Sequence, residues 1–362
     1  MRYNNSILYT FQKPPARFAV MTILLVSGLT LEKPNSFNRQ LTLLSAALKK
    51  QGAHVLLTGP SLEGLENSRM EVDAALLLGY TDQFQLVQQQ ASHDFPLFLW
   101  SQFSRAPDRS SLMPFIPVPL TAKTAQYIRE SGLQRIGPII PHGIDLSLYL
   151  PLNRDEKKAC RAAWGLHNGL VIGTVGAHSR RKRLDLVVKT IHHLKRMGLE
   201  AELIIKTDRN RSLDGEDLEE LARVYEVLSS IHIVTRELNE PELRSLYGCL
   251  DIYINLSEWE GFCIPIVEAL ACGIPVACLP LQGPGEIVPY DRLFIQGYRQ
   301  FDENGTLLCE ADPEEAAKII LHAAEKPAIL EELGRLGTGE AQMRFDIQEV
   351  ARQWLELIKK WA

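Results

Sequence analysis

Short apolar runs alternate with a longer segment of helical period in the first part of the chain. The runs at 23–26, 55–58, 74–78 and 97–100 have the length of buried strands, and residues 39–50 have the spacing of an amphipathic helix. Strands of a parallel sheet need such crossover segments, because the chain must return to the end of the sheet where the previous strand began. The pattern therefore predicts a Rossmann-like domain that opens at residue 21.

The same alternation begins again in the second part of the chain and predicts a second domain of the same kind. Its strand-like runs are residues 170–175, 201–206, 231–234, 251–256 and 274–279.

Two further segments frame these halves. Residues 140–145, with the sequence Ile-Pro-His-Gly-Ile-Asp, carry turn-forming residues after an apolar strand and predict the crossing between the domains. Residues 347–361 have apolar positions at helical spacing, and Lys359 and Lys360 lie at the end where the helix dipole favours positive charge. We therefore expect a terminal amphipathic helix.

Composition fits two globular domains in a reducing compartment. The chain has 362 residues, of which 46% are hydrophobic, and this length exceeds one typical core. The net charge of -5 argues against general nucleic-acid binding, which needs a broad basic surface. The six cysteines form no CxxC pair and lie in or beside apolar segments, so free thiols are favoured over disulfides or a zinc site.

The sequence shows neither a membrane span nor an export signal. No apolar run approaches the roughly 20 residues that cross a bilayer. The first twenty residues are polar and interrupted by Pro14 and Pro15, unlike a signal peptide. We expect a cytoplasmic protein with at most peripheral contact at the inner membrane face, and residues 1–20 as an N-terminal arm.

The segment from Ser257 to Glu286 carries the most informative chemistry. It follows an apolar strand, and Pro265 suits the first turn of a short helix that Gly273 ends. Free backbone N–H groups of residues 261–264 would face the carboxyl end of the strand, where helix termini attract phosphate. The segment therefore predicts a nucleotide-sugar pocket.

Two glutamates in this segment suit two hydroxyl-rich groups. Glu260 lies on the loop and could accept hydrogen bonds from the hydroxyls of a transferred sugar, and Glu268 lies on the helix and could accept from a ribose diol. One alternative is an ordinary loop and helix with two solvated glutamates. Another is the acid pair of a retaining glycosidase, with carboxylates about 5 to 5.5 Å apart. The two Rossmann-like halves weigh against the glycosidase.

A second cluster follows the strand at 170–175. Arg180, Arg181, Lys182 and Arg183 give four adjacent positive charges at a strand-to-helix turn. Fixed cations there would stabilise the charge that grows on a departing diphosphate. Lys182 is the best candidate, while a solvated basic tip and a heparin-like patch are the alternatives.

These motifs resemble a known family. The arrangement E-G-F-C-I-P-I-V-E at 260–268, followed by A-L-A-C-G-I-P-V at 269–276, resembles the donor-site signature of retaining glycosyltransferases of GT-B fold, family 4 (glycosyl transferases group 1). Members carry a motif similar to residues 141–145 at the domain crossing. The resemblance implies two Rossmann-like α/β domains facing across a cleft, with the C-terminal helix crossing back to the N-terminal domain. The implied domains are residues 21–145 plus 346–362 on the acceptor side and 146–345 on the donor side.

The resemblance also implies the activity. We expect a retaining hexosyltransferase that moves a hexose from a nucleotide diphosphate sugar to an acceptor hydroxyl, without an obligatory enzymic nucleophile, a metal or another cofactor. UDP-glucose or a related UDP-sugar is the first expectation for the donor, and GDP-mannose the second. The acceptor would be a sugar, lipid-linked or small molecule in polysaccharide, glycolipid or glycoconjugate synthesis.

The family pattern assigns roles to residues of this chain, with one departure. Ala177 stands where members have an arginine, so we expect Arg181 or Arg180 to replace it, while Lys182 matches the family lysine. Glu237 and Leu238 match the region that contacts the base through backbone groups. The expected catalytic residues are Lys182, Arg181 and Glu260, and the expected donor-binding residues are Glu268, Gly261, Phe262, Cys263, Ile264, Arg180, Glu237 and Leu238.

The acceptor side departs further from the family. The loop at 28–39 lacks the usual paired glycines, and Asn35 or Ser36 either caps the following helix or binds a ligand. Ser101 follows the fourth strand, where many members have a histidine, and His93 precedes that strand. His142 is expected to be structural, and residues 283–286 a turn. A sugar-nucleotide binding protein without transfer activity, an epimerase and a phosphorylase are the rival functions.

Overall fold

The computed structural model describes residues 11–12, 20–32, 35–62, 70–84, 87, 95–167 and 169–361. Most of the predicted N-terminal arm and His93 therefore lie outside the described residues. Within the described ranges, no helix combines the length and the apolar character needed to cross a membrane. The chain divides into unit 1, residues 1–143 with 345–362, and unit 2, residues 144–344.

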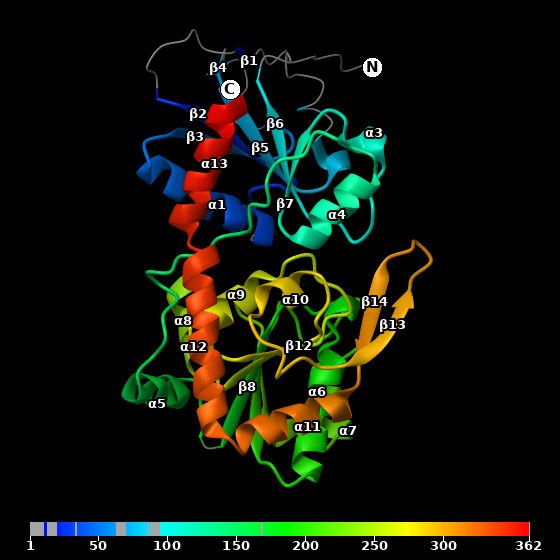
Figure 1. The fold of residues 1–362 in the computed structure, drawn as a ribbon. Helices are drawn as coiled ribbons and strands as arrows, with labels where there is room; N and C mark the ends of the chain where they lie inside the picture. The colour runs from blue at the N-terminus through cyan, green and yellow to red at the C-terminus, as the bar shows by residue number, and fades with distance from the viewer. Residues whose placement is uncertain are drawn as a thin grey trace, which may run out of the picture. The chain divides into compact units, whose positions relative to one another are not determined.

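Unit 1 is built on a five-stranded parallel sheet with the strand order β3-β2-β5-β6-β7 (Figure 1). A two-stranded parallel pair, β1 with β4, completes its strands. The strands are β1 Phe11–Gln12, β2 Thr22–Ser27, β3 His54–Thr58, β4 Met70–Glu71, β5 Ala74–Leu78, β6 Leu97–Ser101 and β7 Ile116–Pro119. The helices are α1 Ser36–Lys50, η1 Thr81–Phe84, α3 Arg109–Leu112, α4 Ala122–Glu130 and α13 Ile347–Trp361.

Unit 2 repeats the plan with a parallel sheet in the order β10-β9-β8-β11-β12 and an antiparallel hairpin, β13 with β14. The strands are β8 Leu170–Val175, β9 Ala201–Lys206, β10 Ile231–Val234, β11 Ile252–Asn255, β12 Val276–Cys278, β13 Gly297–Phe301 and β14 Leu307–Ala311. The helices are α5 Arg154–Ala163, η2 Arg180–Lys182, α6 Leu184–Arg196, α7 Leu218–Val224, η3 Leu228–Ser230, α8 Glu240–Gly248, α9 Ile264–Ala271, α10 Gly283–Ile287, α11 Pro313–Ala324 and α12 Pro327–Arg344.

All the strands predicted from the apolar runs are present, and so is the terminal helix. Two strands are shorter than predicted, since β11 covers Ile252–Asn255 and β12 covers Val276–Cys278. The turn predicted at 283–286 is wrong, because Gly283–Ile287 form the short helix α10. Pro284 suits its first turn, where a missing N–H costs no hydrogen bond.

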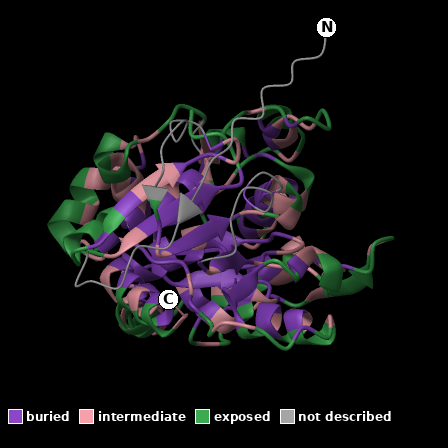
Figure 2. Ribbon diagram, turned by 90° about the horizontal axis from the view of Figure 1, so that it is seen from above, coloured by how far each residue is buried: buried purple, intermediate pink, exposed green. Residues whose placement is uncertain are grey.

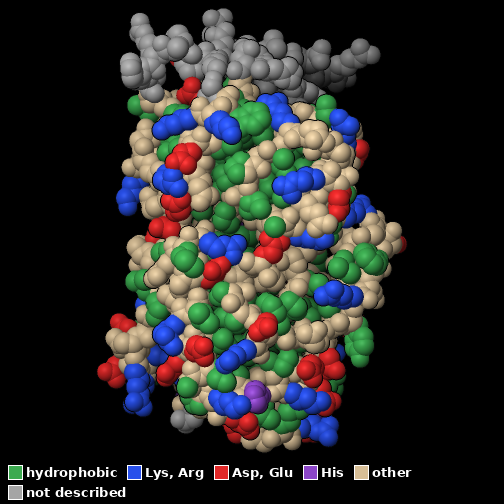
Figure 3. All heavy atoms as spheres, in the orientation of Figure 1, with side chains coloured by type: hydrophobic (Ala, Val, Ile, Leu, Met, Phe, Trp, Pro, Cys, Tyr) green, Lys and Arg blue, Asp and Glu red, His purple; other side chains and the backbone are tan. Residues whose placement is uncertain are grey.

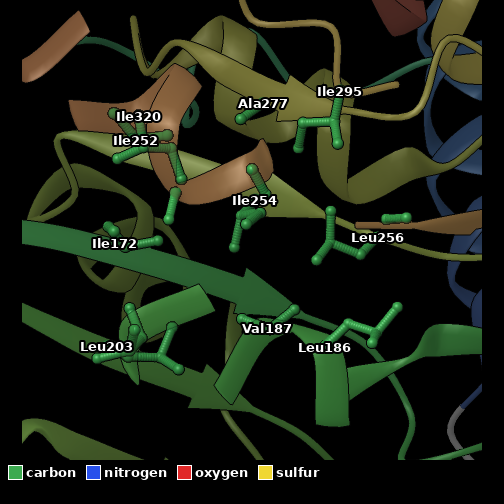
Figure 4. Close-up of a cluster of buried hydrophobic side chains, with 14 of the residues drawn as sticks. Ile172, Leu186, Val187, Leu203, Ile252, Ile254, Leu256, Ala277, Ile295 and Ile320 are labelled. Carbon is green, nitrogen blue, oxygen red and sulfur yellow. The ribbon is translucent and has the colours of Figure 1, made fainter. Parts of the chain in front are cut away.

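Apolar side chains from the sheet and the covering helices form the core of each unit. In unit 2, Ile172 of β8, Ile254 of β11 and Val187 of α6 lie together (Figure 4). In unit 1, Trp354 of α13 is fully buried, and its ring centroid lies 5.5 Å from that of Trp100. Figure 2 colours most residues of the sheet strands as buried.

Charged side chains of both signs lie on the face drawn in Figure 3. On this face, Lys and Arg side chains are interspersed with Asp and Glu side chains.

Strand order marks one place in each sheet where a ligand can enter. In unit 1 the first strand of the sheet, β2, lies between β3 and β5, and in unit 2 the first strand, β8, lies between β9 and β11. The connections from such a strand and its neighbour leave on opposite faces of the sheet, so a crevice opens at the carboxyl ends of the strands. We call these crevices the β2/β5 and β8/β11 switch points.

Candidate functional site

The basic turn follows β8 and forms one wall of the β8/β11 switch point. Its residues Arg180–Lys182 make a single 3-10 turn, and Arg183 ends it with the left-handed backbone angle φ 48°. The Lys182 side chain folds back over Gly176, since a Cβ added to that glycine would lie 3.3 Å from Lys182 Cε. The turn thereby directs Lys182 across the carboxyl end of β8.

The loop after β11, residues 256–263, forms the opposite wall. The backbone N–H of Glu258 donates to the carbonyl of Arg181 at 2.9 Å, which joins this loop to the basic turn. Gly283 N–H donates to the carbonyl of Glu260 at 3.2 Å, and Trp259 Nε1 donates to Gln282 Oε1 at 2.6 Å. The loop is therefore fixed on both sides.

Lys182, Arg181 and Glu260 form one ionic cluster at this switch point. Lys182 Nζ contacts Glu260 Oε1, and an Arg181 guanidinium nitrogen lies 2.9 Å from Glu260 Oε2. Glu260 is 7% exposed. Burial alone would raise the pKa of its carboxyl, but the charges of Lys182 and Arg181 outweigh burial and lower that pKa to about 2. Glu260 is thus a carboxylate at any physiological pH.

The N-terminus of α9 opens from the same loop. Cys263 is the N-cap of this helix, and its backbone has φ 75° and ψ 75°, a left-handed conformation that is costly for any residue except glycine. Cys263 provides no side-chain cap. Gly261 and Phe262 precede it and Ile264 begins the helix, so these predicted donor-binding residues all adjoin the ionic cluster in sequence.

Glu268 lies one helical turn further along α9 and is buried. It is 1% exposed, and Tyr247 of α8 donates its hydroxyl to Glu268 Oε2 at 2.7 Å. Burial and the neighbouring Glu268 charge raise the pKa of Tyr247 well above its usual value, so this phenol remains a donor. Sequence reasoning did not identify Tyr247. Its only signal is an aromatic residue at the apolar end of a helix, a pattern shared by most core positions.

Arg180 and Arg183 do not join the ionic cluster. Arg183 reaches Asp185, Glu258 and Glu310, each at 3.0 Å. Burial opposes the charge of Arg183, but these carboxylates, led by Asp185, outweigh it and raise the pKa of the guanidinium. Arg180 lines a separate pocket with Arg183. Of the two arginines predicted to replace the family arginine, the structure brings Arg181 and not Arg180 to Glu260.

The predicted base-contacting residues lie at the carboxyl end of β10. Glu237 is exposed and Leu238 half-buried, between β10 and the N-cap Asn239 of α8. Strands β9 and β10 lie in sequence beyond β8 in the sheet order, so these residues are two strands away from the basic turn.

The acceptor-side residues lie in unit 1. Asn35 caps α1, accepting from Asn38 N–H at 2.9 Å, and Ser36 is the exposed first residue of that helix. Ser101 ends β6 and is 1% exposed. His142 packs edge-on against Trp100 with ring centroids 4.5 Å apart, and its burial lowers its pKa to about 3. The structural interpretation of His142 fits a neutral, packed imidazole.

The contacts that the structure describes at the β2/β5 switch point of unit 1 are made by neutral groups. Gly28 follows β2 and Gly79 follows β5, and a Cβ on Gly79 would lie 2.9 Å from Gly28 Cα. The Gln83 amide fills the space over both, and its oxygen accepts from Tyr80 N–H at 2.7 Å. Behind it, Ser27 donates its hydroxyl to buried Asn38.

Among the residues that the structure describes, no three His, Cys, Asp or Glu side chains lie in an arrangement that could hold a metal ion.

Part of unit 2 matches a family of known proteins. Residues 169–326 match the family model for glycosyl transferases group 1. A GDP-mannose-dependent alpha-mannosyltransferase of Mycolicibacterium smegmatis is 27% identical over 146 residues, which cover 40% of this chain and 34% of that protein. A D-inositol 3-phosphate glycosyltransferase of Rhodococcus erythropolis is 30% identical over 193 residues, covering 51% of this chain and 42% of that one. The chain thus spans less than half of the length of either relative.

Solved structures share the fold over nearly the whole chain. Sucrose-phosphate synthase from Thermosynechococcus elongatus superposes with a TM-score of 0.74 at 16% identity, covering 94% of this chain and 98% of that one. Anabaena Alr3699/HepE in complex with UDP-glucose gives a TM-score of 0.71 at 16% identity, covering 94% and 100%. The predicted fold class and family resemblance are confirmed: residues 169–326 of this chain match the model of the glycosyl transferases group 1 family, and its two Rossmann-like units have the GT-B fold.

Proposed function

We propose that this chain is a glycosyltransferase that moves a hexose from a nucleotide diphosphate sugar to an acceptor hydroxyl. The observation that carries the proposal is the ionic cluster of Lys182, Arg181 and Glu260 at the β8/β11 switch point. The match of residues 169–326 to the glycosyl transferases group 1 family model supports it. So does the position of the cluster, since open α/β sheets bind ligands at switch points.

The cations would act on the diphosphate. When the bond between sugar and phosphate breaks, negative charge grows on the departing diphosphate, and cations already in place stabilise that charge most in the transition state. Lys182 has the greater role, because its side chain is 13% exposed whereas that of Arg181 is 40% exposed. A buried charge is screened less by water.

Glu260 would have two roles. It holds the two cations in one place before the donor binds, and its carboxylate can accept hydrogen bonds from sugar hydroxyls. A group whose pKa is about 2 is a poor general base near neutral pH, because it rarely takes a proton. Glu260 therefore serves as a positioning group rather than a base.

The nucleotide would lie along α9. The uncapped N-terminus of this helix after Cys263 offers backbone N–H groups to phosphate. Glu268, supported by the Tyr247 hydroxyl, would accept from the ribose diol. The support by Tyr247 holds one carboxylate oxygen in a fixed direction.

We propose that transfer retains the configuration at the anomeric carbon and needs no metal. The bond between C1 and the phosphate oxygen breaks, the acceptor oxygen bonds to C1 on the same face, and the acceptor proton passes to the departing phosphate. Lys182 and Arg181 supply charge that a divalent cation would otherwise supply. Activity should persist in EDTA, and loss of activity on chelation, restored by added Mg²⁺ or Mn²⁺, would overturn metal independence.

The proposal also covers the identity of the donor and the cellular location of the protein. We propose UDP-glucose or a related UDP-sugar first and GDP-mannose second, on the ground that one structural neighbour binds UDP-glucose and one relative uses GDP-mannose. The described cysteines are all free thiols, which supports a reducing, cytoplasmic location.

The proposal is tested by calorimetric titration of the full chain with UDP-glucose, GDP-mannose and their nucleotides. Analysis of the released nucleotide and of the anomeric configuration of the product follows. Glu268→Gln should mainly weaken nucleotide binding, and Glu260→Gln should mainly lower turnover. Failure of every donor to bind at millimolar concentration would refute the proposal.

A second candidate function is a sugar-nucleotide binding protein without transfer. Ala177 in place of the family arginine and the neutral β2/β5 switch point favour it. Tight donor binding without transfer or donor hydrolysis would identify it. An epimerase would instead release an altered sugar nucleotide, and a phosphorylase would release a sugar phosphate.

A further inference from the structure

Beside the loop of residues 256–263, which we call the donor loop, unit 2 contains a pocket to which the proposed function gives no role. Its volume is about 300 Å³, within the size range of small-molecule sites. Four segments distant in sequence contribute to it: the basic turn, the loop between β9 and α7, the loop after β11, and the β13–β14 hairpin. The lining residues are Arg180, Arg183, Asp185, Ser212, Asp214, Glu216, Glu258, Gln300 and Glu310.

Internal ion pairs fix the inner wall of this pocket. Arg183 binds Asp185, Glu258 and Glu310, and therefore joins the turn, the donor loop and the hairpin. The backbone adds a second link, because Cys309 N–H donates to the carbonyl of Glu258 at 3.0 Å. The wall is thus built before any ligand arrives.

Other lining groups keep their hydrogen-bonding capacity. The side chains of Arg180, Asp214 and Gln300 make no hydrogen bond or ion pair with the residues that the structure describes. Together they offer a guanidinium, a carboxylate and an amide, which donate and accept. Five carboxylates against two guanidinium groups leave an excess of negative charge that disfavours a phosphate or an acidic sugar.

The hairpin places an aromatic ring at the rim. Tyr298 and Gln300 are two residues apart on β13, so they lie on the same face of the hairpin, and Tyr298 is paired across the strands with Glu310. Gln300 and Glu310 both line the pocket. Tyr298, which is 77% exposed, therefore borders the pocket, on the β13–β14 hairpin that projects from unit 2 (Figure 1).

We propose that this pocket binds a neutral, polyhydroxylated carbohydrate at a site separate from the donor site. A sugar ring has hydroxyls at its edge and an apolar face of C–H groups. Carboxylate, guanidinium and amide groups would hold the hydroxyls, and the ring of Tyr298 would pack on the apolar face. This binding does not depend on transfer activity.

The chain offers a matched control on the same strand. Phe301 is 73% exposed, close to the value for Tyr298, but it is three residues from Tyr298 and so lies on the opposite face of the hairpin. Tyr298→Ala and Phe301→Ala therefore remove similar exposed aromatic rings, and only the first borders the pocket.

Saturation-transfer NMR and calorimetry on the full chain, with saturating UDP present, test the proposal. The probes are the neutral disaccharides maltose, cellobiose and mannobiose, with glucose 6-phosphate and glucosamine as charged counterparts. We expect millimolar binding of at least one neutral disaccharide, weakened at least fivefold by Tyr298→Ala and by Gln300→Ala and unchanged by Phe301→Ala.

Three results would overturn the proposal. The first is that no neutral disaccharide binds at about 20 mM, a concentration that detects millimolar affinities. The second is an equal loss of disaccharide affinity in the Tyr298 and Phe301 variants. The third is stronger binding of a charged probe than of the neutral disaccharides. UDP affinity, measured in the same samples, reports on the donor site independently. A failure of this pocket is thus distinguishable from a failure of the proposed function.

Discussion

The β8/β11 and β2/β5 switch points occupy equivalent places in two sheets of the same kind, yet they differ in chemistry. The first holds a buried carboxylate between a lysine and an arginine. The second is filled by the neutral amide of Gln83 against two facing glycines. Each switch point is held by local contacts, and among the described side chains that make them, those at the first are charged and that of Gln83 at the second is neutral.

This difference shows that topology determines where a binding site can lie and that side-chain chemistry determines what it can bind. Strand order alone places a crevice at the carboxyl ends of β8 and β11 and another at those of β2 and β5. Side chains then decide what each can bind, since the fold by itself does not specify function. A diphosphate suits the cationic crevice, and a neutral group suits the uncharged one.

Removing the lysine should produce the largest contrast between the two switch points. We expect Lys182→Ala to lower turnover by about 10²–10³, the typical cost of losing one preorganised group that stabilises transition-state charge. Gln83→Ala in unit 1 should leave donor affinity within twofold. Single-turnover kinetics with calorimetric donor titration would measure both, and equal losses in the two variants would remove the distinction.

Lowering the pH should reduce the stability that the charged β8/β11 switch point contributes and should leave the contribution of the β2/β5 switch point unchanged. The pKa of Glu260 is about 2 in the folded protein, against 4.5 for an unperturbed glutamate, so its contribution to stability is present above pH 4.5 and is lost as the pH falls towards 2. The difference in unfolding free energy between wild type and Glu260→Gln should shrink by up to about 3 kcal/mol over this range. Urea unfolding at pH 6, 5, 4 and 3 checks this, and a difference independent of pH would contradict it.

Replacing a glycine by alanine at each switch point should show which of the two is the more rigid. A Cβ on Gly283 would lie 2.6 Å from the Cα and the carbonyl oxygen of Phe262, both backbone atoms of the donor loop. We expect Gly283→Ala to cost about 1–3 kcal/mol and to weaken donor binding, because the loop must shift.

Gly28→Ala is the matched substitution in unit 1. Its nearest contact is the Gln83 side-chain oxygen at 2.1 Å, which can rotate away, while the nearest backbone atom is 3.1 Å distant. The thermal unfolding temperature should fall less than in Gly283→Ala. A larger fall for Gly28→Ala would show that the neutral crevice is the more rigid of the two.

The smallest effect concerns backbone strain in the donor loop. Because Cys263 is left-handed at φ 75°, Cys263→Gly should be more stable than Cys263→Ala by about 1 kcal/mol. Both variants lose the buried thiol, so their difference isolates the backbone. Equal stabilities in denaturant titration would mean that the surrounding contacts, rather than the left-handed angle, determine the cost.

Sequence patterns predicted the elements whose signal is local. Buried parallel strands appear as apolar runs, and the terminal helix appears as a 3.6-residue period, so both were located to within a few residues. β7 was missed because Pro117 and Pro119 interrupt its apolar run. It lies at the edge of the sheet, where a strand tolerates proline because one side needs no ladder hydrogen bonds.

The candidate site was predicted only in part, because its assembly is not local. Proximity of Lys182 to Glu260 follows from two strand-end loops meeting at one switch point, and the family motif indicated both residues. Arg181, and not Arg180, lies beside Glu260 in a 3-10 turn that Arg183 ends with a left-handed backbone angle. The sequence carries no signal for that angle, nor for the Tyr247–Glu268 contact.

Unit 1 is complete only when helix α13, far along the chain from the strands of its sheet, has packed onto it. Trp354 is fully buried against Phe98 and Trp100, at ring-centroid distances of 5.9 and 5.5 Å. During synthesis on the ribosome, β6 therefore emerges more than two hundred residues before the helix that covers it. Unit 2 can fold as a contiguous segment in the meantime, since domains generally fold as units. Unit 1 is therefore completed only after α13 has been made, and its aromatic core stays uncovered for longer than the core of unit 2.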